Sequence, residues 1–253
     1  MIALPDRVIG DPRTLLAQFG EIFVAFDDDE SGCLVTAVAT PSGDWCVKHA
    51  VNHRGVDAQA RALAVHRAVQ HPALVGPTRV VEGDDGPILV YPWIRGEQLR
   101  MNPMVIQLST IARLVAIETV IEVHALINKA GFVSIDLYDG NLLYDDRVHV
   151  IDIDEYRPAP FVLDADRTLG STRFMAPEEF VRGATLDART TVFQLGRTAA
   201  VLFDPPQGLN RGHVPIALVP IIARATADEP DDRFEDAGTL LHAWRSALRD
   251  TTN

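Results

Sequence analysis

Three polar side chains that could act on a phosphate ester or a hydroxyl lie close together in the sequence: Asp136, Asn141 and Asp152. Residues 141–144 and 148–151 are short apolar runs joined by a polar turn, and this pattern predicts a β-hairpin. The hairpin would return Asp152 at its end to the side of Asn141 at its start. Amide and carboxylate oxygens are ligands for a hard cation such as Mg²⁺, which commonly shares its other positions with phosphate oxygens.

Asp136 precedes Asn141 by five residues, across a turn at Asp139-Gly140. A tight turn is expected there because glycine adopts positive φ without steric cost. The turn would let the Asp136 carboxylate face the same cavity as the two candidate metal ligands, where it could orient or deprotonate a hydroxyl. The spacing alone is a weak indication, because an Asp-rich turn is more often a solvated loop.

Composition excludes several classes of function. The 253 residues suffice for one large domain or two small lobes. A formal net charge of −12 argues against a nucleic-acid backbone or an anionic membrane as the main partner. The two cysteines, Cys33 and Cys46, match neither a zinc motif nor a disulfide framework and indicate a reducing compartment, so we expect a cytoplasmic protein. We expect neither a signal peptide nor a membrane span, because no run of about 18 apolar residues occurs.

The first part of the chain predicts a small antiparallel sheet with one helix. Segments rich in Val, Ile, Phe and Trp alternate with polar turns, and Lys48 lies in the third of them. Residues 57–69 carry apolar side chains on one face and predict a helix that ends before Pro72. The predicted strands are residues 21–26, 33–40, 45–51, 74–81 and 87–91.

The second part is predicted to be mostly helical. Residues 109–129 form a long amphipathic helix that leads into the loop with Asp136. Residues 215–226 and 236–248 are predicted closing helices, and residues 204–214 are a polar loop rich in Pro and Gly.

These features, taken in chain order, resemble the protein kinase family, and in particular compact bacterial serine/threonine kinases. Asp-x-x-x-x-Asn followed by a hairpin and an Asp is similar to the catalytic and metal loops of kinases. Residues 170–178, Gly-Ser-Thr-Arg-Phe-Met-Ala-Pro-Glu, resemble the kinase segment Gly-Thr-x-x-Tyr-x-Ala-Pro-Glu that supports a polypeptide substrate. The resemblance covers residues 20–248. It implies an α+β, two-lobed kinase-like fold, with a five-stranded antiparallel N-lobe plus one helix in residues 1–94 and a mostly helical C-lobe in residues 95–253.

The resemblance also implies a role for each candidate residue. Asp136 would be the catalytic base, and Asn141 and Asp152 would bind Mg²⁺ with Asp154 as a further carboxylate. Lys48 would hold the phosphates of ATP. The adenine of ATP would lie against the hinge formed by Tyr91, Pro92, Trp93 and Ile94.

Two further expectations follow from the same resemblance. Glu178 and Arg233 would form a buried, structural ion pair. The candidate sites of autophosphorylation are Thr168, Ser171 and Thr172.

Some positions depart from the kinase pattern and leave three functions open. Ala62 stands where the helix of active kinases supplies a glutamate, and residues 27–30 are acids where kinases have a glycine-rich loop; both features favour a pseudokinase that serves as a binding or regulatory module. Asp154 and Tyr138 favour phosphate transfer to a small hydroxylated molecule, as in aminoglycoside and choline kinases. Residues 170–178 favour a protein kinase. In addition, Thr191 replaces the usual aspartate of the central helix.

Overall fold

The computed structural model describes residues 2, 4–28, 32–100, 107–203 and 214–250. The chain forms two compact units, one built from Met1–His66 and Val75–Arg95 and the other from Arg67–Leu74 and Gly96–Asn253. The predicted boundary between residues 94 and 95 lies one residue before this division. Of the predicted acidic turn, residues 29 and 30 lie outside the described residues, as does the predicted loop 204–214 except for its last residue.

The first unit contains a mixed sheet of six strands rather than the predicted antiparallel sheet of five. The additional strand, β1, pairs in parallel with β5 through Arg7↔Glu82 and Val8↔Gly83. Sequence patterning missed it because two residues are too short to show alternation. The strand order is β1-β5-β6-β4-β3-β2, with β1 Arg7–Val8, β2 Glu21–Asp28, β3 Cys33–Thr40, β4 Gly43–Ala50, β5 Arg79–Gly83 and β6 Pro87–Pro92.

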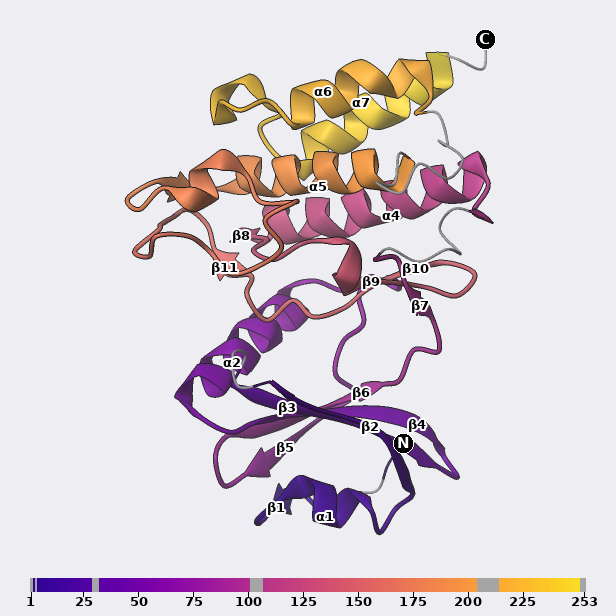
Figure 1. The fold of residues 1–253 in the computed structure, drawn as a ribbon, viewed down its shortest axis with the longest axis vertical. Coiled ribbons are helices and arrows are strands. Elements are labelled where there is room, and N and C mark those ends of the chain that lie inside the picture. Colours follow the sequence, from indigo (N-terminus) through magenta and orange to yellow (C-terminus); the bar gives the residue numbers. More distant parts are fainter. Residues whose placement is uncertain (1, 3, 29–31, 101–106, 204–213, 251–253) are drawn as a thin grey trace. The chain divides into compact units, whose positions relative to one another are not determined.

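Two helices accompany this sheet (Figure 1). The short helix α1, Pro12–Leu16, begins after Asp11, whose side chain accepts a hydrogen bond from the backbone N–H of Arg13. The longer helix α2, His53–Ala68, begins four residues before the predicted start at residue 57. The core of the unit combines alternate strand residues with the N-terminal segment: Ile2, Leu4, Val8, Leu16, Val38, Trp45, Val47, Val81, Ile88 and Val90.

The second unit is built around four helices, so the fold of the described chain is α+β. Helix α4 packs against α5 and α7, and α5 also packs against α6. Helix α5 is buried on almost every side, as expected for the central helix of a bundle. The helices are α4 Thr110–Lys129, α5 Ala188–Phe203, α6 Val219–Ala225 and α7 Ala237–Asp250.

Short strands and single helical turns connect the helices of the second unit and carry its loops (Figure 1). The strands pair as β10-β9-β7, β11-β8 and β12-β13. Their bounds are β7 Glu97–Gln98, β8 Phe132–Val133, β9 Leu142–Tyr144, β10 Val148–Val150, β11 Arg157–Pro158, β12 Phe161–Val162 and β13 Thr185–Leu186. The 3₁₀ turns are η1 Asp139–Asn141, η2 Pro177–Phe180, η3 Ile216–Leu218 and η4 Pro230–Asp232. Within the described part of the chain, no helix has both the length and the apolar character needed to cross a membrane.

Candidate functional site

The predicted hairpin is confirmed. Strands β9 and β10 are antiparallel, with Leu142 opposite Val150, and the backbone N–H of Ile151 donates to the carbonyl of Asn141 at 3.0 Å. This last bond extends the ladder by one residue. It therefore fixes Asn141 opposite Ile151, and Asp152 follows directly at the open end of the hairpin.

The Asn141 side chain links the hairpin to the preceding loop. Its amide nitrogen Nδ2 donates to the carbonyl oxygen of Asp136 at 2.8 Å. An amide has one donor end and one acceptor end. Because the donor end is used by the loop, the oxygen is the end of Asn141 that a cation could take.

Asp136 and Asp152 share an unusual backbone conformation. They are the residues other than glycine with positive φ in the described part of the chain, at 64° and 56°. A residue with a side chain is strained there by roughly 1–3 kcal/mol, and such strain persists only where the surroundings enforce it. Both candidate acids are thus held in place by the fold rather than by their local preference.

The electrostatic environment of Asp136 suits a base. Burial, together with the negative charges of Asp152 and Glu155, raises the pKa of its carboxyl to about 7, against the lowering effect of a backbone hydrogen bond from Ser171. Its Oδ1 has no hydrogen-bond partner among the described residues. A carboxyl group that titrates near neutral pH and has an oxygen without a hydrogen-bond partner can accept a proton from a hydroxyl under physiological conditions.

Segment 170–178 approaches Asp136 closely at Gly170. This residue has φ of 121°, and a Cβ atom there would lie 2.7 Å from Asp136 Oδ1. Only glycine can therefore occupy the position without displacing the carboxylate. The beginning of the predicted substrate segment and the candidate base are in direct contact.

The residues predicted to bind metal provide oxygen donors but not a complete cage. In the residues that the structure describes, no three or more His, Cys, Asp or Glu side chains are grouped to hold a metal ion. Mg²⁺ is usually bound by one or two protein groups together with water and phosphate oxygens, and the amide of Asn141 and the carboxylate of Asp152 are donors of the kind that this ion takes. The repulsion between Asp136 and Asp152, visible in the raised pKa of Asp136, is what a nearby cation would relieve.

Further side chains, of which there was little indication in the sequence, form hydrogen bonds that hold the loop around Asp136. The Thr191 hydroxyl, on α5, accepts hydrogen bonds from the backbone N–H of Ser134 at 3.0 Å and from Asn128 Nδ2 at 3.3 Å. On the other side, Arg173 pairs with the buried carboxylate of Asp139 at 3.1 Å. The only indication in the sequence was Thr191, at the position where the kinase pattern has an aspartate.

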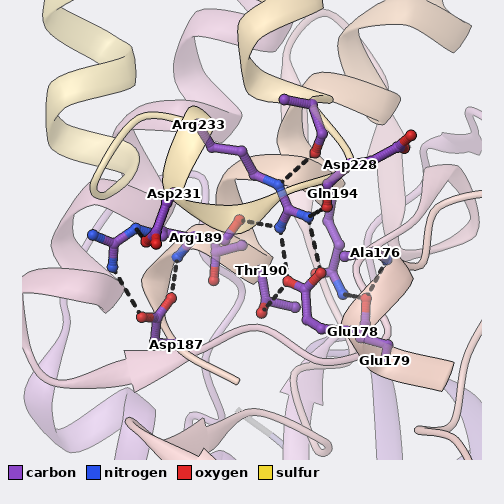
Figure 2. A network of polar contacts seen from close by, with 12 residues as sticks. Ala176, Glu178, Glu179, Asp187, Arg189, Thr190, Gln194, Asp228, Asp231 and Arg233 are labelled. Carbon is purple, nitrogen blue, oxygen red and sulfur yellow. Dashed lines mark hydrogen bonds and ion pairs between the residues drawn. The ribbon is translucent and has the colours of Figure 1, made fainter. Parts of the chain in front are cut away.

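The predicted ion pair between Glu178 and Arg233 is present and buried (Figure 2). Arg233 contacts both carboxylate oxygens, at 2.7 and 2.8 Å. Its guanidinium also donates to the backbone carbonyls of Ala227 and Asp228, both at 2.8 Å, and of Arg189 at 3.2 Å. These bonds tie segment 170–178 to the loop before α7.

The three candidate phosphorylation sites differ in exposure. Thr172 is exposed and Ser171 is half-buried. Thr168 is buried, and its hydroxyl donates to Glu179 Oε1 at 2.8 Å. In this structure the Thr168 hydroxyl is part of the interior rather than a group presented to another enzyme.

The candidate nucleotide-binding residues belong to the first unit. Lys48 lies on β4, opposite Val35 of β3 and Leu89 of β6. Its backbone carbonyl accepts a hydrogen bond at 3.0 Å from Nε2 of Gln59, a fully buried residue of α2. Ala62, which stands where the helix of active kinases has a glutamate, is completely buried, so α2 packs there without a charge.

The predicted hinge continues from β6. Tyr91 and Pro92 end the strand, opposite Cys46 and Trp45 of β4. The backbone N–H of Trp93 donates to the carbonyl of Asp44 at 3.0 Å, and its ring packs edge-on against Phe23. Residues 91–94, which include Ile94, are all half-buried. The structure thus brings Asp136, Asn141 and Asp152 together within the second unit, and Lys48 and residues 91–94 within the first.

Comparison with known proteins adds no assignment: neither a family model nor a curated protein matches this chain.

Proposed function

We propose that this protein is a phosphotransferase that moves the γ-phosphoryl group of Mg-ATP to a hydroxyl, as a compact serine/threonine protein kinase does. The observation that carries the proposal is the environment of Asp136. Its carboxyl is buried, titrates near neutral pH, has an oxygen without a hydrogen-bond partner, and lies within one loop of a hairpin that presents an amide and a second carboxylate.

In the proposed reaction the Asp136 carboxylate orients the acceptor hydroxyl and takes its proton. The hydroxyl oxygen forms the new bond to phosphorus while the bond from the γ-phosphorus to the bridging oxygen breaks, and ADP leaves. Asn141 and Asp152, with Asp154 as a further ligand, would hold Mg²⁺, which when bound neutralises charge on the phosphate oxygens. Lys48 is proposed to hold the ATP phosphates, and Tyr91, Pro92, Trp93 and Ile94 to contact the adenine.

The protonation state of Asp136 fits this order of events. The negative charge of Asp152 disfavours the ionised form of Asp136 and contributes to its raised pKa. A cation held by Asn141 and Asp152 would offset that charge and lower the pKa of Asp136. The base would then be ionised when the nucleotide complex has formed, which is when it is needed.

The acceptor is proposed to be a serine or threonine of a polypeptide, because segment 170–178 lies against Asp136 at Gly170. The main alternative is a small hydroxylated molecule. It is favoured by Tyr138, whose ring stacks under the Arg100 guanidinium at 5.9 Å and takes the place of a kinase lysine. A binding module without catalysis is favoured by the uncharged, buried Ala62 on α2. The proposed compartment is the cytoplasm, on the basis of the cysteine content, and no nucleic-acid partner is proposed.

Incubation with labelled ATP and Mg²⁺, followed by mass spectrometry of the protein, tests the proposal. Label on the protein itself or on an added protein supports a protein kinase. Label that appears only on an added hydroxylated metabolite supports the small-molecule alternative. Metal-dependent ATP binding without transfer supports the binding module, and the absence of any Mg-ATP binding by calorimetry contradicts a phosphotransferase.

The matched variants for this assay are Asp136→Asn and Asp164→Asn. Asp164 is an exposed acid of the same unit. Transfer should be lost in the first variant and kept in the second.

A further inference from the structure

Glu179 is a completely buried acid whose hydrogen bonds come from neutral donors. The Thr168 hydroxyl donates to Oε1 at 2.8 Å. Ala176 N and Gln194 Nε2 donate to Oε2 at 2.7 and 3.0 Å (Figure 2). The neighbouring Glu178, by contrast, takes up the cation of Arg233. Burying a carboxylate with neutral partners is unfavourable, and burial raises the pKa of Glu179 to about 7. A residue kept in such surroundings calls for a role beyond packing.

Glu179 determines how the Gln194 side chain is oriented. The amide nitrogen of Gln194 donates to the carboxylate, so the amide oxygen points the other way, to the Ser134 hydroxyl at 2.7 Å. Rotating the amide by half a turn would place its oxygen against the carboxylate and remove the bond to Glu179. Glu179 therefore determines that the amide oxygen of Gln194, an acceptor, faces the Ser134 hydroxyl.

The Ser134 hydroxyl is the donor in both of its side-chain contacts. It donates to Gln194 Oε1 at 2.7 Å and to Thr191 Oγ1 at 3.1 Å, and Thr191 Oγ1 also accepts from Ser134 N and Asn128 Nδ2. The contact with Gln194 is the shorter of the two. Hydrogen bonds therefore connect Thr191, Ser134, Gln194 and the carboxylate of Glu179 in that order.

Both ends of this chain belong to the proposed site. Ser134 precedes Asp136 by two residues, and the strained backbone of Asp136, with φ of 64°, needs support from its surroundings. At the other end, Glu179 adjoins Glu178 of segment 170–178, and Thr168 contributes both its hydroxyl and its backbone N–H to Glu179.

We propose that Glu179 and Gln194 are positioning residues for Asp136, and that they couple the placement of the segment from Thr168 to Glu179 to the loop that carries the candidate base. The purpose of this coupling rests on the proposed function, whereas the contacts that make it are independent of that function. An acceptor that orders segment 168–179 would thereby also fix Asp136 for proton transfer.

Amide hydrogen exchange of the intact protein tests the coupling without requiring activity. Gln194→Met keeps the length of the side chain and removes both bonds. It should speed exchange at residues 134–136 about tenfold, the factor expected for losing one hydrogen bond. The control is Thr198→Val, one turn further along α5, which removes a buried bond to the carbonyl of Gln194 without reaching the loop. It should leave exchange at residues 134–136 unchanged.

Ser134→Ala cuts the same chain at its other end. It should speed exchange at residues 134–136 as Gln194→Met does, while residues 168–179 stay protected. In the double variant Ser134→Ala/Gln194→Met, amide exchange at residues 134–136 should be no faster than in either single variant, because both substitutions break the same chain of hydrogen bonds. Loop exchange in Gln194→Met equal to that of Thr198→Val, or additive effects in the double variant, would overturn the proposal.

Kinetics separate this proposal from the proposed function. If the unmodified protein turns over Mg-ATP, Gln194→Met should lower kcat about tenfold or more with KM for Mg-ATP unchanged, and Thr198→Val should change neither. A lowered nucleotide affinity at constant kcat would contradict a positioning role. If the unmodified protein transfers no phosphate to any acceptor, the proposed function fails, and the exchange experiment still decides whether the coupling exists.

Discussion

Replacing Arg233 by methionine should destabilise the second unit more than almost any other single change. The Arg233 side chain has no exposed surface, and the Glu178 carboxylate that it contacts is nearly as buried. The substitution would leave that carboxylate with the Thr190 hydroxyl, at 2.8 Å, as its remaining described partner. It would also leave the carbonyls of Ala227 and Asp228 without their bonds from the guanidinium.

The expected cost of Arg233→Met is about 3–5 kcal/mol in the free energy of unfolding, the range for removing one member of a buried ion pair. The matched control is Arg189→Met in the same region (Figure 2). The Arg189 side chain pairs with Asp187 at 3.0 Å and Asp231 at 3.8 Å; Asp231 is exposed, and Arg189 and Asp187 are half-buried. Screened pairs of this kind contribute up to about 1 kcal/mol, so the control should cost little.

Urea unfolding provides the measurement. Trp244 is buried in α7 and reports on the second unit once Trp45 and Trp93 of the first unit have been replaced by phenylalanine. Equal stabilities of Arg233→Met and Arg189→Met would refute the reasoning. The double variant Glu178→Leu/Arg233→Met should recover most of the loss, because the cost arises from an isolated buried charge rather than from the absence of the pair.

Three further predictions concern the site. Asp136→Asn should lower phosphate transfer, measured with labelled ATP, by several orders of magnitude with nearly unchanged ATP affinity; normal transfer in this variant would show that another group is the base. Asp152→Ala should abolish the metal dependence of ATP binding, which calorimetry measures. Gly170→Ala should cost roughly 1–3 kcal/mol and reduce transfer, because its Cβ would lie 2.7 Å from Asp136 Oδ1 at φ of 121°; a variant as stable and active as the parent would contradict that close approach. Because burial raises the pKa of Glu179 from 4.5 to about 7, the folded state favours the neutral form, so its contribution to stability is present below pH 4.5 and is lost as pH rises through 7. Relative to the parent, the free energy of unfolding of Glu179→Gln, measured with urea, should therefore rise by about 3 kcal/mol as pH increases from 4.5 through 7. Parallel pH profiles of the two proteins would rule out the raised pKa of Glu179.

The parts of the molecule that the sequence predicted are those with local patterns. The hairpin of β9 and β10 follows from two apolar runs around a polar turn, and the Glu178–Arg233 pair follows from a motif with fixed partners. Helix α2 and strand β5 were predicted as elements, but with boundaries displaced by four and five residues, because the segments before them have mixed polarity.

The network beneath Asp136 could not be predicted from the sequence, for a physical reason. Ser134, Gln194 and Glu179 are separated by 60 and 15 residues, and two of them are uncharged. Their chemistry depends on which way an amide points, and that is fixed only when the packed structure brings the carboxylate to it. Likewise β1 exists because β5 offers it an edge, and not because of a pattern in its own two residues.

Thr191 connects this network to the resemblance with kinases. In the kinase pattern an aspartate stands at this position, and a carboxylate there could accept directly from the backbone N–H of Ser134. In this chain the Thr191 hydroxyl accepts that bond at 3.0 Å, and the Ser134 hydroxyl donates to Gln194, which in turn donates to Glu179. The acid of this network is Glu179 instead, and three hydrogen bonds separate it from position 191.

Thr191→Asp should therefore make Gln194 dispensable. The new carboxylate would accept from Ser134 N, Ser134 Oγ and Asn128 Nδ2, the groups that now meet at the Thr191 hydroxyl. In this background Gln194→Met should no longer speed amide exchange at residues 134–136, although it does so in the parent protein. If Gln194→Met were as harmful in the Thr191→Asp background as in the parent, the loop would depend on Gln194 for packing alone, and a relocated charge would not be the reason for the network.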